Sequence, residues 1–183
     1  GGVTHTLTGL RRGDVVGIRG PYGTGWGVSD GRGGDVVIVA GGIGLAPLRP
    51  ALLQVLANRD AYGRVVLLYG TRNPAAVLFR DELESLARRG DAEIHLAVEK
   101  TEGEPWTGAR GYVTDLLDRA GIDPERSFAV ACGPPVFYKF LLERLVEAGF
   151  ARDRILMSLE RRMECGVGKC GHCAVGYTFT CLH

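Results

Sequence analysis

Five short, predominantly apolar runs, several of them rich in β-branched residues, recur along this chain and are separated by stretches long enough for a helix. The runs are Val36–Ala40, Val65–Tyr69, Ile94–Val98, Phe128–Cys132 and Ile155–Leu159. A strand that is apolar on both faces must be covered on both faces, as it is in a parallel sheet with helices on each side. The pattern therefore predicts an α/β fold with a doubly wound, parallel, five-stranded sheet.

The stretches between these runs have the length and composition of helices. They are Leu48–Asn58, Phe79–Arg89, Val113–Ala120 and Val136–Ala148. Each lies between two successive predicted strands, so that each strand is joined to the next by a crossover of the βαβ kind. We therefore expect residues 35–160 to form one domain.

The two ends of the chain differ from this pattern. Residues 1–34 are rich in glycine and turn-forming residues around the apolar run Val15–Ile18, which we interpret as the last strands of a structure that begins upstream. Residues 161–183 lose both helix and strand periodicity. The sequence thus predicts three parts, with boundaries after residues 34 and 160.

Composition excludes several classes of protein. Of the 183 residues, 45% are hydrophobic and 23% charged, the balance of a soluble globular protein. A net charge of +1 gives no overall reason to expect nucleic acid or an anionic membrane as partner, and no apolar run approaches the roughly 20 residues of a membrane span. Four of the five cysteines lie between positions 165 and 181, which favours a metal site over disulfides and indicates a reducing compartment. We expect the cytoplasm.

A glycine turn follows the first predicted strand, with the sequence Gly41-Gly42-Ile43-Gly44-Leu45-Ala46-Pro47. Glycines at a strand-to-helix turn let the backbone approach a diphosphate, and the free N–H groups of the helix start face the anion. Pro47 suits the first helical turn, where its missing N–H is not needed. The turn predicts a dinucleotide site. Because the spacing is not Gly-x-Gly-x-x-Gly, a turn that binds nothing remains the alternative.

Three further segments follow other predicted strands and should reach the same edge of the sheet, where ligands of such folds bind. They are Gly70-Thr71-Arg72-Asn73, Trp106-Thr107-Gly108-Ala109-Arg110-Gly111 and Cys132-Gly133-Pro134-Pro135. We take Thr71, Gly108 and Gly111, with Gly133, Pro134 and Pro135, as candidate cofactor-binding residues.

Two side chains in these segments have specific candidate roles. Arg72 is expected to contact the adenosine ribose or its 2′-phosphate, and the alternative is a solvated loop residue. No acidic residue ends the second strand to bind a ribose 2′-hydroxyl, and the sequence does not distinguish NADH from NADPH. Cys132 is the candidate catalytic residue beside the nicotinamide ring. The alternative is a small buried apolar residue.

The cysteine segment has a defined spacing. Cys165, Cys170, Cys173 and Cys181 form a Cys-x4-Cys-x2-Cys…Cys pattern, which is typical of plant-type [2Fe-2S] sites. Interleaved glycines allow the backbone to bend around the cluster and to donate N–H bonds to sulfur. Zinc is the first alternative, although structural zinc sites usually have two short ligand pairs, and disulfides or free thiols are the second. His172 is expected to be an exposed loop residue, because four cysteines complete the set.

Taken together, these motifs resemble those of a known protein family. The chain resembles the FAD/NAD(P)-binding electron-transfer subunits of the ferredoxin–NADP reductase-like superfamily, in particular the gamma subunit of nickel–iron hydrogenases and sulfhydrogenases, the related subunit of anaerobic sulfite reductase and the dihydroorotate dehydrogenase electron-transfer subunit. The matching stretches are Gly20–Gly23, Gly41–Pro47, Cys132–Pro135 and Glu164–Cys173. They span nearly the whole chain.

The resemblance implies an oxidoreductase component that passes electrons between NAD(P)H, FAD and a [2Fe-2S] cluster, to or from a larger catalytic subunit, with the hydrogenase type favoured over the sulfite reductase and dihydroorotate dehydrogenase types. It also implies that residues 1–34 are the C-terminal part of a flavin-binding β-barrel, and that Gly2, Val3 and Thr4 contact the FAD pyrophosphate. The family's upstream Arg-x-Tyr-Ser/Thr flavin motif is not in this sequence, so only part of the FAD pocket is expected. The alternative function is a non-catalytic nucleotide-binding module with a structural zinc site.

Overall fold

The computed structural model describes residues 2–182 and divides into two compact units. One unit is Gly25–Glu160, here called the sheet unit. The other, the cysteine unit, combines the segment that ends at Thr24 with the segment that begins at Arg161. Each unit is described by itself.

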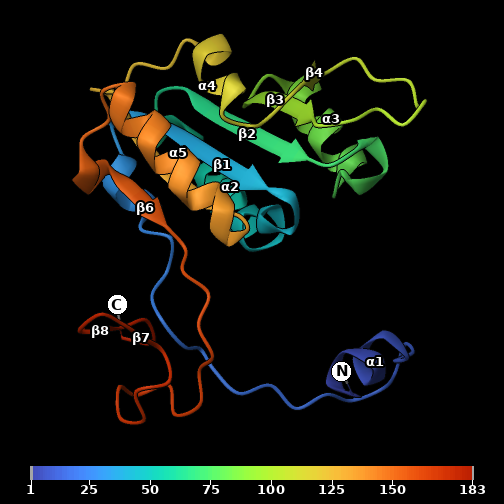
Figure 1. Ribbon diagram of the computed structural model, residues 1–183, viewed down its shortest axis with the longest axis vertical. Coiled ribbons are helices and arrows are strands. Elements are labelled where there is room, and N and C mark those ends of the chain that lie inside the picture. Colours follow the sequence, from blue (N-terminus) through green and yellow to red (C-terminus); the bar gives the residue numbers. More distant parts are fainter. Residues whose placement is uncertain (1, 183) are drawn as a thin grey trace. The chain divides into compact units, whose positions relative to one another are not determined.

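The sheet unit is built on six parallel strands (Figure 1). Their order is β4-β3-β2-β1-β5-β6, with β1 at the centre. The strands are β1 Asp35–Gly41, β2 Val65–Thr71, β3 Glu93–Val98, β4 Ala109–Arg110, β5 Ser127–Cys132 and β6 Ile155–Met157. The α/β class and the parallel sheet are confirmed. The predicted number of strands was wrong, because β4 has only two residues and too short a run to show a strand pattern.

Helices cover both faces of this sheet (Figure 1). Residues Val36, Ile38 and Ala40 of β1 pack in one core with α2 Leu45–Ala57 and α3 Arg80–Arg89. Val37 and Val39 point to the opposite face and pack with α4 Asp115–Ala120 and α5 Pro135–Glu147. Since every residue of β1 is buried, its continuous apolar run is explained by the two cores. Burial of a side chain such as Ile38 favours the folded state by about 1.5–3 kcal/mol.

Short 3₁₀ helices punctuate the connections. They are η1 Val28–Gly31, η2 Gly42–Gly44, η3 Arg59–Ala61, η4 Pro74–Ala76 and η5 Arg152–Arg154. The longest described helices, α2 and α5, have 13 residues each, and none of those described is both long and apolar enough to traverse a bilayer.

The N-terminal part of the cysteine unit begins with α1 Gly2–Thr8, which buries no residue. The strand expected at Val15–Ile18 is wrong for this structure, because residues 10–24 form no strand, and Val15 and Ile18 are 94% and 90% exposed. A strand needs a neighbour for its backbone groups, and no described strand pairs with this run. The assignment of residues 1–34 to a flavin-binding barrel stays a prediction.

The C-terminal part of the cysteine unit contains one small hairpin. Strands β7 Ala174–Val175 and β8 Thr178–Phe179 pair antiparallel across the turn Gly176-Tyr177. Gly176 has φ +60°, which suits glycine in such a turn. The rest of this segment is irregular, as its glycine content predicts.

Candidate functional site

The predicted binding segments converge on one edge of the sheet, at the carboxyl ends of its strands. Ala40 of β1 pairs with Tyr69 of β2 on one side and with Cys132 of β5 on the other. Farther across, Thr71 pairs with Val98, and Val98 pairs with Arg110. The register therefore brings the glycine turn and the segments after β2, β3 and β5 to a common edge. Their role in cofactor binding stays a prediction.

The glycine turn combines close packing with an open backbone. A Cβ on Gly44 would lie 2.1 Å from the carbonyl oxygen of Cys132, so only glycine lets this turn approach the end of β5. Gly42 has φ +54° and nothing within 4 Å of the position of a Cβ, while Ile43 is 82% exposed. Gly42 thus presents bare backbone to open space at the start of the short 3₁₀ helix η2, which leads into α2.

Pro47 lies in the first turn of α2, as expected. It is the third residue of the helix, where an N–H has no intrahelical acceptor. Its carbonyl oxygen accepts a hydrogen bond of 2.8 Å from the indole nitrogen of Trp26. This contact ties the start of α2 to the segment that precedes β1 in the same unit.

The side chain of Tyr138 in α5 forms hydrogen bonds that hold the turn after β5. The sequence motifs did not reveal these contacts. The Tyr138 hydroxyl accepts a 3.2 Å hydrogen bond from the backbone N–H of Gly133 and donates to the carbonyl of Ser158, which follows β6. The hydroxyl oxygen also lies 3.7 Å from the sulfur of Cys132. Burial raises the pKa of Tyr138 to about 12, so the phenol stays protonated at neutral pH. Cys132 itself is half-buried at the end of β5.

The proline-rich turn Pro134-Pro135 begins α5, with Pro135 as its first residue. A Cβ on Gly133 would lie 2.6 Å from the ring of Phe137, so this glycine is required by packing whether or not a ligand approaches. Gly133, Pro134 and Pro135 are therefore placed beside Cys132 by local structure.

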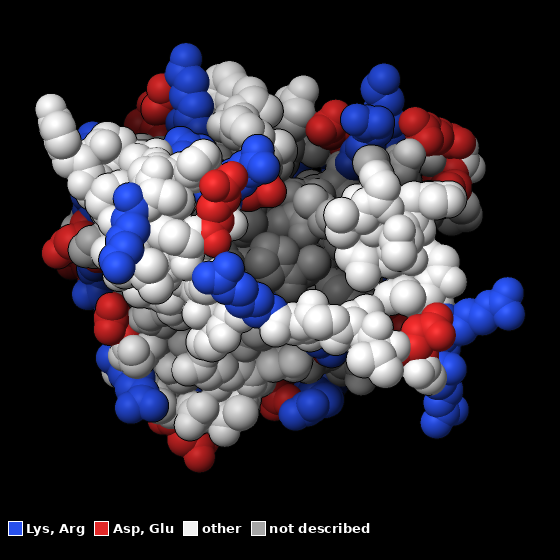
Figure 2. Space-filling model, turned by 90° about the horizontal axis from the view of Figure 1, so that it is seen from below, with Lys and Arg blue, Asp and Glu red and all other residues white. Residues whose placement is uncertain are grey.

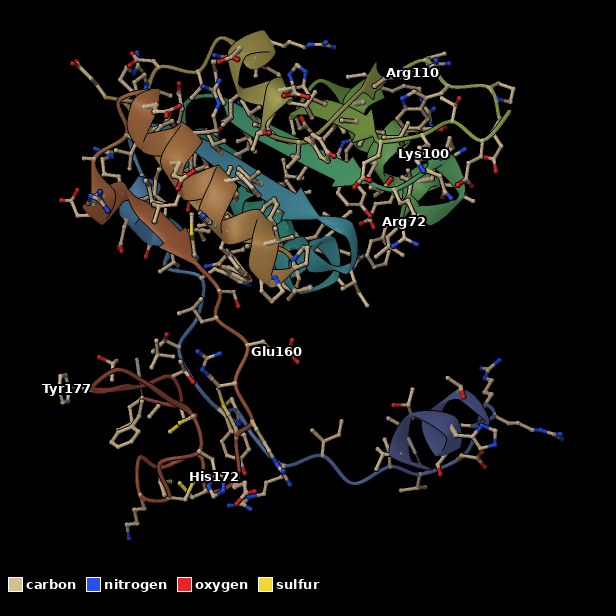
Figure 3. All side chains as sticks on the ribbon, viewed as in Figure 1. Arg72, Lys100, Arg110, Glu160, His172 and Tyr177 are labelled. Atoms are coloured by element: carbon tan, nitrogen blue, oxygen red, sulfur yellow. The ribbon has the colours of Figure 1, made fainter. Side chains whose placement is uncertain are left out.

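Basic side chains follow three neighbouring strands at this edge. Arg72 and Lys100 come after β2 and β3, and Arg110 ends β4; Figure 3 shows all three on the same side of the sheet unit. The backbone N–H of Lys100 donates to the carbonyl of Arg72 at 3.0 Å, so these two residues are adjacent. Sequence reasoning named Arg72 and missed the other two, although Lys100 follows a predicted strand and Arg110 lies in a segment that was already expected at this edge.

The other residues named after β2 and β3 have local structural roles. The hydroxyl of buried Thr71 donates to the carbonyl of Asn73 at 3.0 Å. A Cβ on Gly108 would lie 2.7 Å from the ring of Trp106, and one on Gly111, at φ +127°, would lie 2.5 Å from a carboxylate oxygen of Asp115. These glycines are explained by packing, and their contact with a cofactor stays a prediction.

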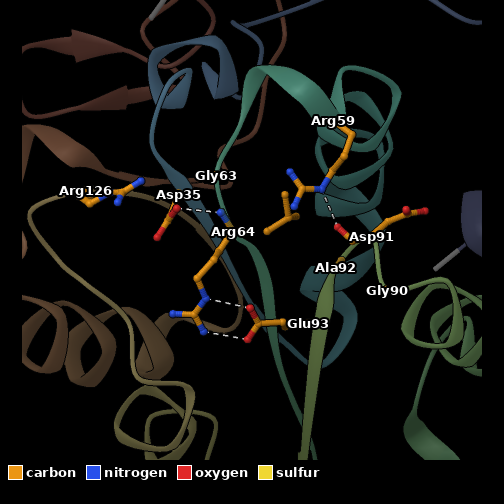
Figure 4. Close-up of a pocket in the computed structure, with 10 residues that line it drawn as sticks. Asp35, Arg59, Gly63, Arg64, Gly90, Asp91, Ala92, Glu93 and Arg126 are labelled. Atoms are coloured by element: carbon orange, nitrogen blue, oxygen red, sulfur yellow. Dashed lines mark hydrogen bonds and ion pairs between the residues drawn. The ribbon is translucent and has the colours of Figure 1, made fainter.

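A cavity of about 380 Å³ opens at the opposite edge of the sheet, where the strands begin (Figure 4). Several of its charged side chains form hydrogen bonds within the protein. Arg64 pairs with Glu93 at 2.8 Å, and Arg59 donates to the carbonyl of Asp91 at 2.9 Å. A carboxylate oxygen of Asp35 accepts from the backbone N–H of Arg64 at 2.7 Å. Since ligands of parallel sheets bind at the carboxyl ends of the strands, we do not assign the nucleotide to this cavity.

The cysteine segment directs backbone N–H groups at sulfur. The sulfur of Cys165 accepts from the backbone of Val167, Lys169 and Cys170 at 3.3–3.4 Å, and the sulfur of Cys181 accepts from Gly168 at 3.3 Å. Glycines at positions 166, 168 and 171 have φ of +72°, +69° and +79°, which lets the loop curl around the sulfurs.

These contacts lower the pKa of three of the four thiols in the segment and raise that of the fourth. Hydrogen bonds from Val167 and then Cys170 and Lys169 lower the pKa of Cys165. The pKa of Cys170 is lowered first by the backbone of His172 and then by that of Cys165, and the pKa of Cys173 is also lowered, first by Cys181. The hydrogen bond to Cys173 raises the pKa of Cys181.

The thiols interact as two pairs, Cys165 with Cys170 and Cys173 with Cys181, and all five cysteines of the chain are free thiols. Among residues 2–182 no group of three or more Cys, His, Asp or Glu side chains is arranged to hold a metal ion. The ligand set therefore stays a prediction. His172 is exposed, as expected, with its Nδ1 3.4 Å from a carboxylate oxygen of Glu164.

A segment from the other end of the chain holds the cysteine loop. Arg19 donates to the carbonyl of Cys165, and the backbone N–H of Gly23 donates to the carbonyl of Cys181, both at 3.3 Å. The ring of Tyr22 packs on Gly166, where a Cβ would lie 2.2 Å from it. These contacts were not predicted, because they join residues more than 140 positions apart.

The proposed flavin contacts Gly2, Val3 and Thr4 lie in α1, where all three are exposed. No hydrogen bond between α1 and another predicted site residue is present in the described part of the chain. Figure 2 shows basic and acidic side chains interspersed on one face of the molecule, in agreement with the small net charge.

Residues 38–143 match the model of the oxidoreductase NAD-binding domain family. The chain is 40% identical to sulfhydrogenase 2 subunit gamma of Pyrococcus furiosus, over 96% of this chain and 65% of that protein. It is 34% identical to the probable dihydroorotate dehydrogenase B (NAD(+)), electron transfer subunit, of the same organism, over 99% of this chain and 64% of that protein. It thus spans slightly less than two thirds of these curated relatives.

Among solved structures, a ferredoxin NADP+ reductase from Neisseria gonorrhoeae with bound FAD and NADP has a TM-score of 0.61 and 22% identity, covering 74% of this chain and 60% of that one. At this identity the likeness concerns the fold. The family model covers more than half of the chain. The chain therefore belongs to the oxidoreductase NAD-binding domain family.

Proposed function

We propose that this chain is an electron-transfer component that passes electrons between NAD(P)H, FAD and a [2Fe-2S] cluster, to or from a larger catalytic subunit of the hydrogenase type. The observation that carries the proposal is the set of backbone N–H groups aimed at the sulfurs of Cys165 and Cys181. The names of the similar proteins, which are gamma or electron transfer subunits, support a catalytic partner.

The cysteine segment fits a cluster in its chemistry. Cluster ligands must be thiolates, and the lowered pKa of Cys165, Cys170 and Cys173 favours that form. N–H bonds to sulfur stabilise the negative charge that four thiolates bring together. When bound, a [2Fe-2S] cluster supplies single-electron transfer, and Cys165, Cys170, Cys173 and Cys181 would hold it.

The nucleotide is assigned to the carboxyl edge of the sheet. Gly41, Gly42, Ile43 and Gly44 present backbone to the diphosphate at the start of α2, whose dipole favours an anion. Arg72, Lys100 and Arg110 supply positive charge for the adenosine end. Cys132, positioned by Tyr138, would lie beside the nicotinamide ring.

The flavin is assigned to the N-terminal segment, with Gly2, Val3 and Thr4 as contacts to its pyrophosphate. Residues 1–34 would then be the end of the flavin-binding barrel, 35–160 the NAD(P)-binding domain and 161–183 the cluster-binding segment. We place the protein in the cytoplasm, because clustered cysteines that serve as metal ligands are typical of proteins in reducing compartments.

The experiment is a metal and sulfide analysis of the protein purified without oxygen. We expect about two iron and two acid-labile sulfide per chain, with visible absorption that bleaches on reduction. A colourless protein that carries zinc and still binds the nucleotide would contradict the proposal and favour the zinc-stabilised nucleotide-binding module.

A further inference from the structure

We infer that Tyr22 is a positioning residue for the proposed cluster: its phenol hydroxyl donates a hydrogen bond to a sulfur of the group held by the cysteine segment and thereby sets its reduction potential. This inference rests on the proposed function, and it assigns a role to a residue that lies more than 140 positions from the first cysteine ligand.

The first observation is that the hydroxyl of Tyr22 is a hydrogen-bond donor without an acceptor among the described residues. The hydroxyl oxygen is also buried. A buried hydroxyl without a partner loses its bonds to water and gains nothing in return. Such groups are rare in folded proteins, and a bound group that accepts the hydrogen bond is a common explanation.

The second observation is where the phenol lies. A Cβ on Gly166 would lie 2.2 Å from Cε1 of Tyr22 and 3.0 Å from Cζ, the carbon that carries the hydroxyl. Gly166 directly follows Cys165 and has φ +72°. The phenol therefore packs against the backbone of the cysteine loop, and glycine at position 166 is what leaves room for it.

The third observation is that the segment around Tyr22 is fixed to the loop on both sides. The guanidinium of Arg19 lies 5.5 Å from the centre of the Tyr22 ring and donates to the carbonyl of Cys165. The backbone N–H of Gly23 donates to the carbonyl of Cys181. The phenol is thus held between contacts to the first and the last of the four cysteines.

The chemical consequence concerns charge. Reduction adds one negative charge to an iron–sulfur group, and a hydrogen bond to sulfur stabilises the more negative state. The sulfur of Cys165 already accepts from three backbone N–H groups, and an O–H donor from Tyr22 adds to the same effect. Loss of the hydroxyl alone should make the group harder to reduce.

The test is Tyr22→Phe, which keeps the ring on Gly166 and removes only the hydroxyl. We expect unchanged iron and sulfide content and a more negative reduction potential in a spectroscopic redox titration. The matched control is Tyr177→Phe, because Tyr177 is fully exposed at the tip of the hairpin and points away from the segment (Figure 3). We expect its potential to equal that of the wild type.

A second measurement keeps Tyr22 in place, so it does not depend on whether a variant at position 22 folds. In the Tyr177→Phe protein, Tyr22 is the one tyrosine left in the cysteine unit. Labelled with ring-deuterated tyrosine and reduced, this protein should show deuteron couplings to the paramagnetic group in electron–nuclear double resonance.

Outcomes separate the two proposals. A wild-type protein without iron and sulfide overturns the proposed function and this inference with it. A wild-type protein that holds the cluster, with a potential that Tyr22→Phe leaves unchanged or with no deuteron coupling, overturns this inference alone.

Discussion

The sheet unit and the cysteine unit are held together by different forces. Strand β1 is buried along its whole length between two apolar cores. In the cysteine unit α1 buries nothing, Cys170 is exposed, and the loop is held by hydrogen bonds to sulfur and to carbonyl oxygens. The difference teaches that the sheet is stabilised mainly by burial of apolar surface, whereas the cysteine loop is shaped mainly by hydrogen bonds to its sulfur and carbonyl oxygen atoms.

Glycine serves the two regions in different ways. In the sheet unit, Gly44 and Gly133 leave room for neighbouring backbone or rings. In the cysteine segment, Gly166, Gly168 and Gly171 supply positive φ angles that bend the chain, and Gly166 and Gly168 also leave room for the side chains of Tyr22 and Leu182. Close packing therefore requires glycine in both regions, whereas a run of positive-φ glycines in one short loop distinguishes the cysteine segment.

The largest expected effect is the loss of iron when one proposed cysteine ligand is removed, which tests whether the two units function independently. Cys170→Ser should reduce the iron and sulfide content to a small fraction of the wild-type level, because a hydroxyl is a poor substitute for a thiolate. Nucleotide affinity should change little, since the sheet does not depend on the cysteine loop for its core. Metal analysis and fluorescence titration with NADH and NADPH measure both quantities.

Cys132→Ser is the matched control for Cys170→Ser, because it changes the one cysteine outside the segment and should leave the iron content intact. Equal loss of nucleotide binding and iron in Cys170→Ser would show that the two units are not independent.

The next effect tests the glycine turn within the sheet unit. Gly42→Leu should weaken nucleotide binding at least about tenfold, because a side chain would fill the space open to the diphosphate. Gly121→Leu is the matched control, since Gly121 has φ +55° against +54° for Gly42, also has nothing within 4 Å of a Cβ, and follows α4 at the other edge of the sheet.

Both leucine variants should lose about 1–2 kcal/mol of stability from the positive φ. Calorimetry gives the stability, and titration of the folded protein gives the affinity. If Gly42→Leu binds the nucleotide as tightly as Gly121→Leu does, the glycine turn is not part of the site.

The smallest effect concerns the ion pair at the amino edge of the sheet. Glu93→Gln should cost less than about 1 kcal/mol at pH 7, because the Glu93 side chain is 45% exposed and its attraction to Arg64 is screened by water. Arg64 also retains its hydrogen bonds to the carbonyls of Ala120 and Gly121.

The effect of pH on this pair has a defined sign. The hydrogen bond from Arg64 lowers the pKa of Glu93 in the folded state. The contribution of the ion pair to stability is therefore complete above about pH 4.3, the pKa of glutamate in the unfolded chain. It is lost as the pH falls through the lower pKa of Glu93 in the folded state. Urea unfolding of wild type and Glu93→Gln should differ at pH 7 and converge in acid. Glu84→Gln, which breaks a more exposed pair on α3, should change less at either pH.

Sequence alone determined five of the six strands of the sheet. Each of the five apolar runs became a strand, and the reason is clearest for β1, whose apolar run is buried along its whole length between two cores. The helices between them were also found, with ends shifted by a few residues, because helix ends depend on local capping. The glycine turn and the segments after β2, β3 and β5 were predicted to share an edge, and parallel pairing brought them there.

Tertiary structure alone decided the contacts between distant parts of the chain. The pairing that forms β4, the bridge from Tyr138 to Ser158 and the packing of Tyr22 on Gly166 leave no repeating pattern in the sequence. The hydrophobic periodicity of a sequence shows which face of a helix or strand is buried, because the pattern of buried residues repeats along the element. A single hydrogen bond or ring contact between distant residues occurs once, and only the folded backbone brings its two partners together.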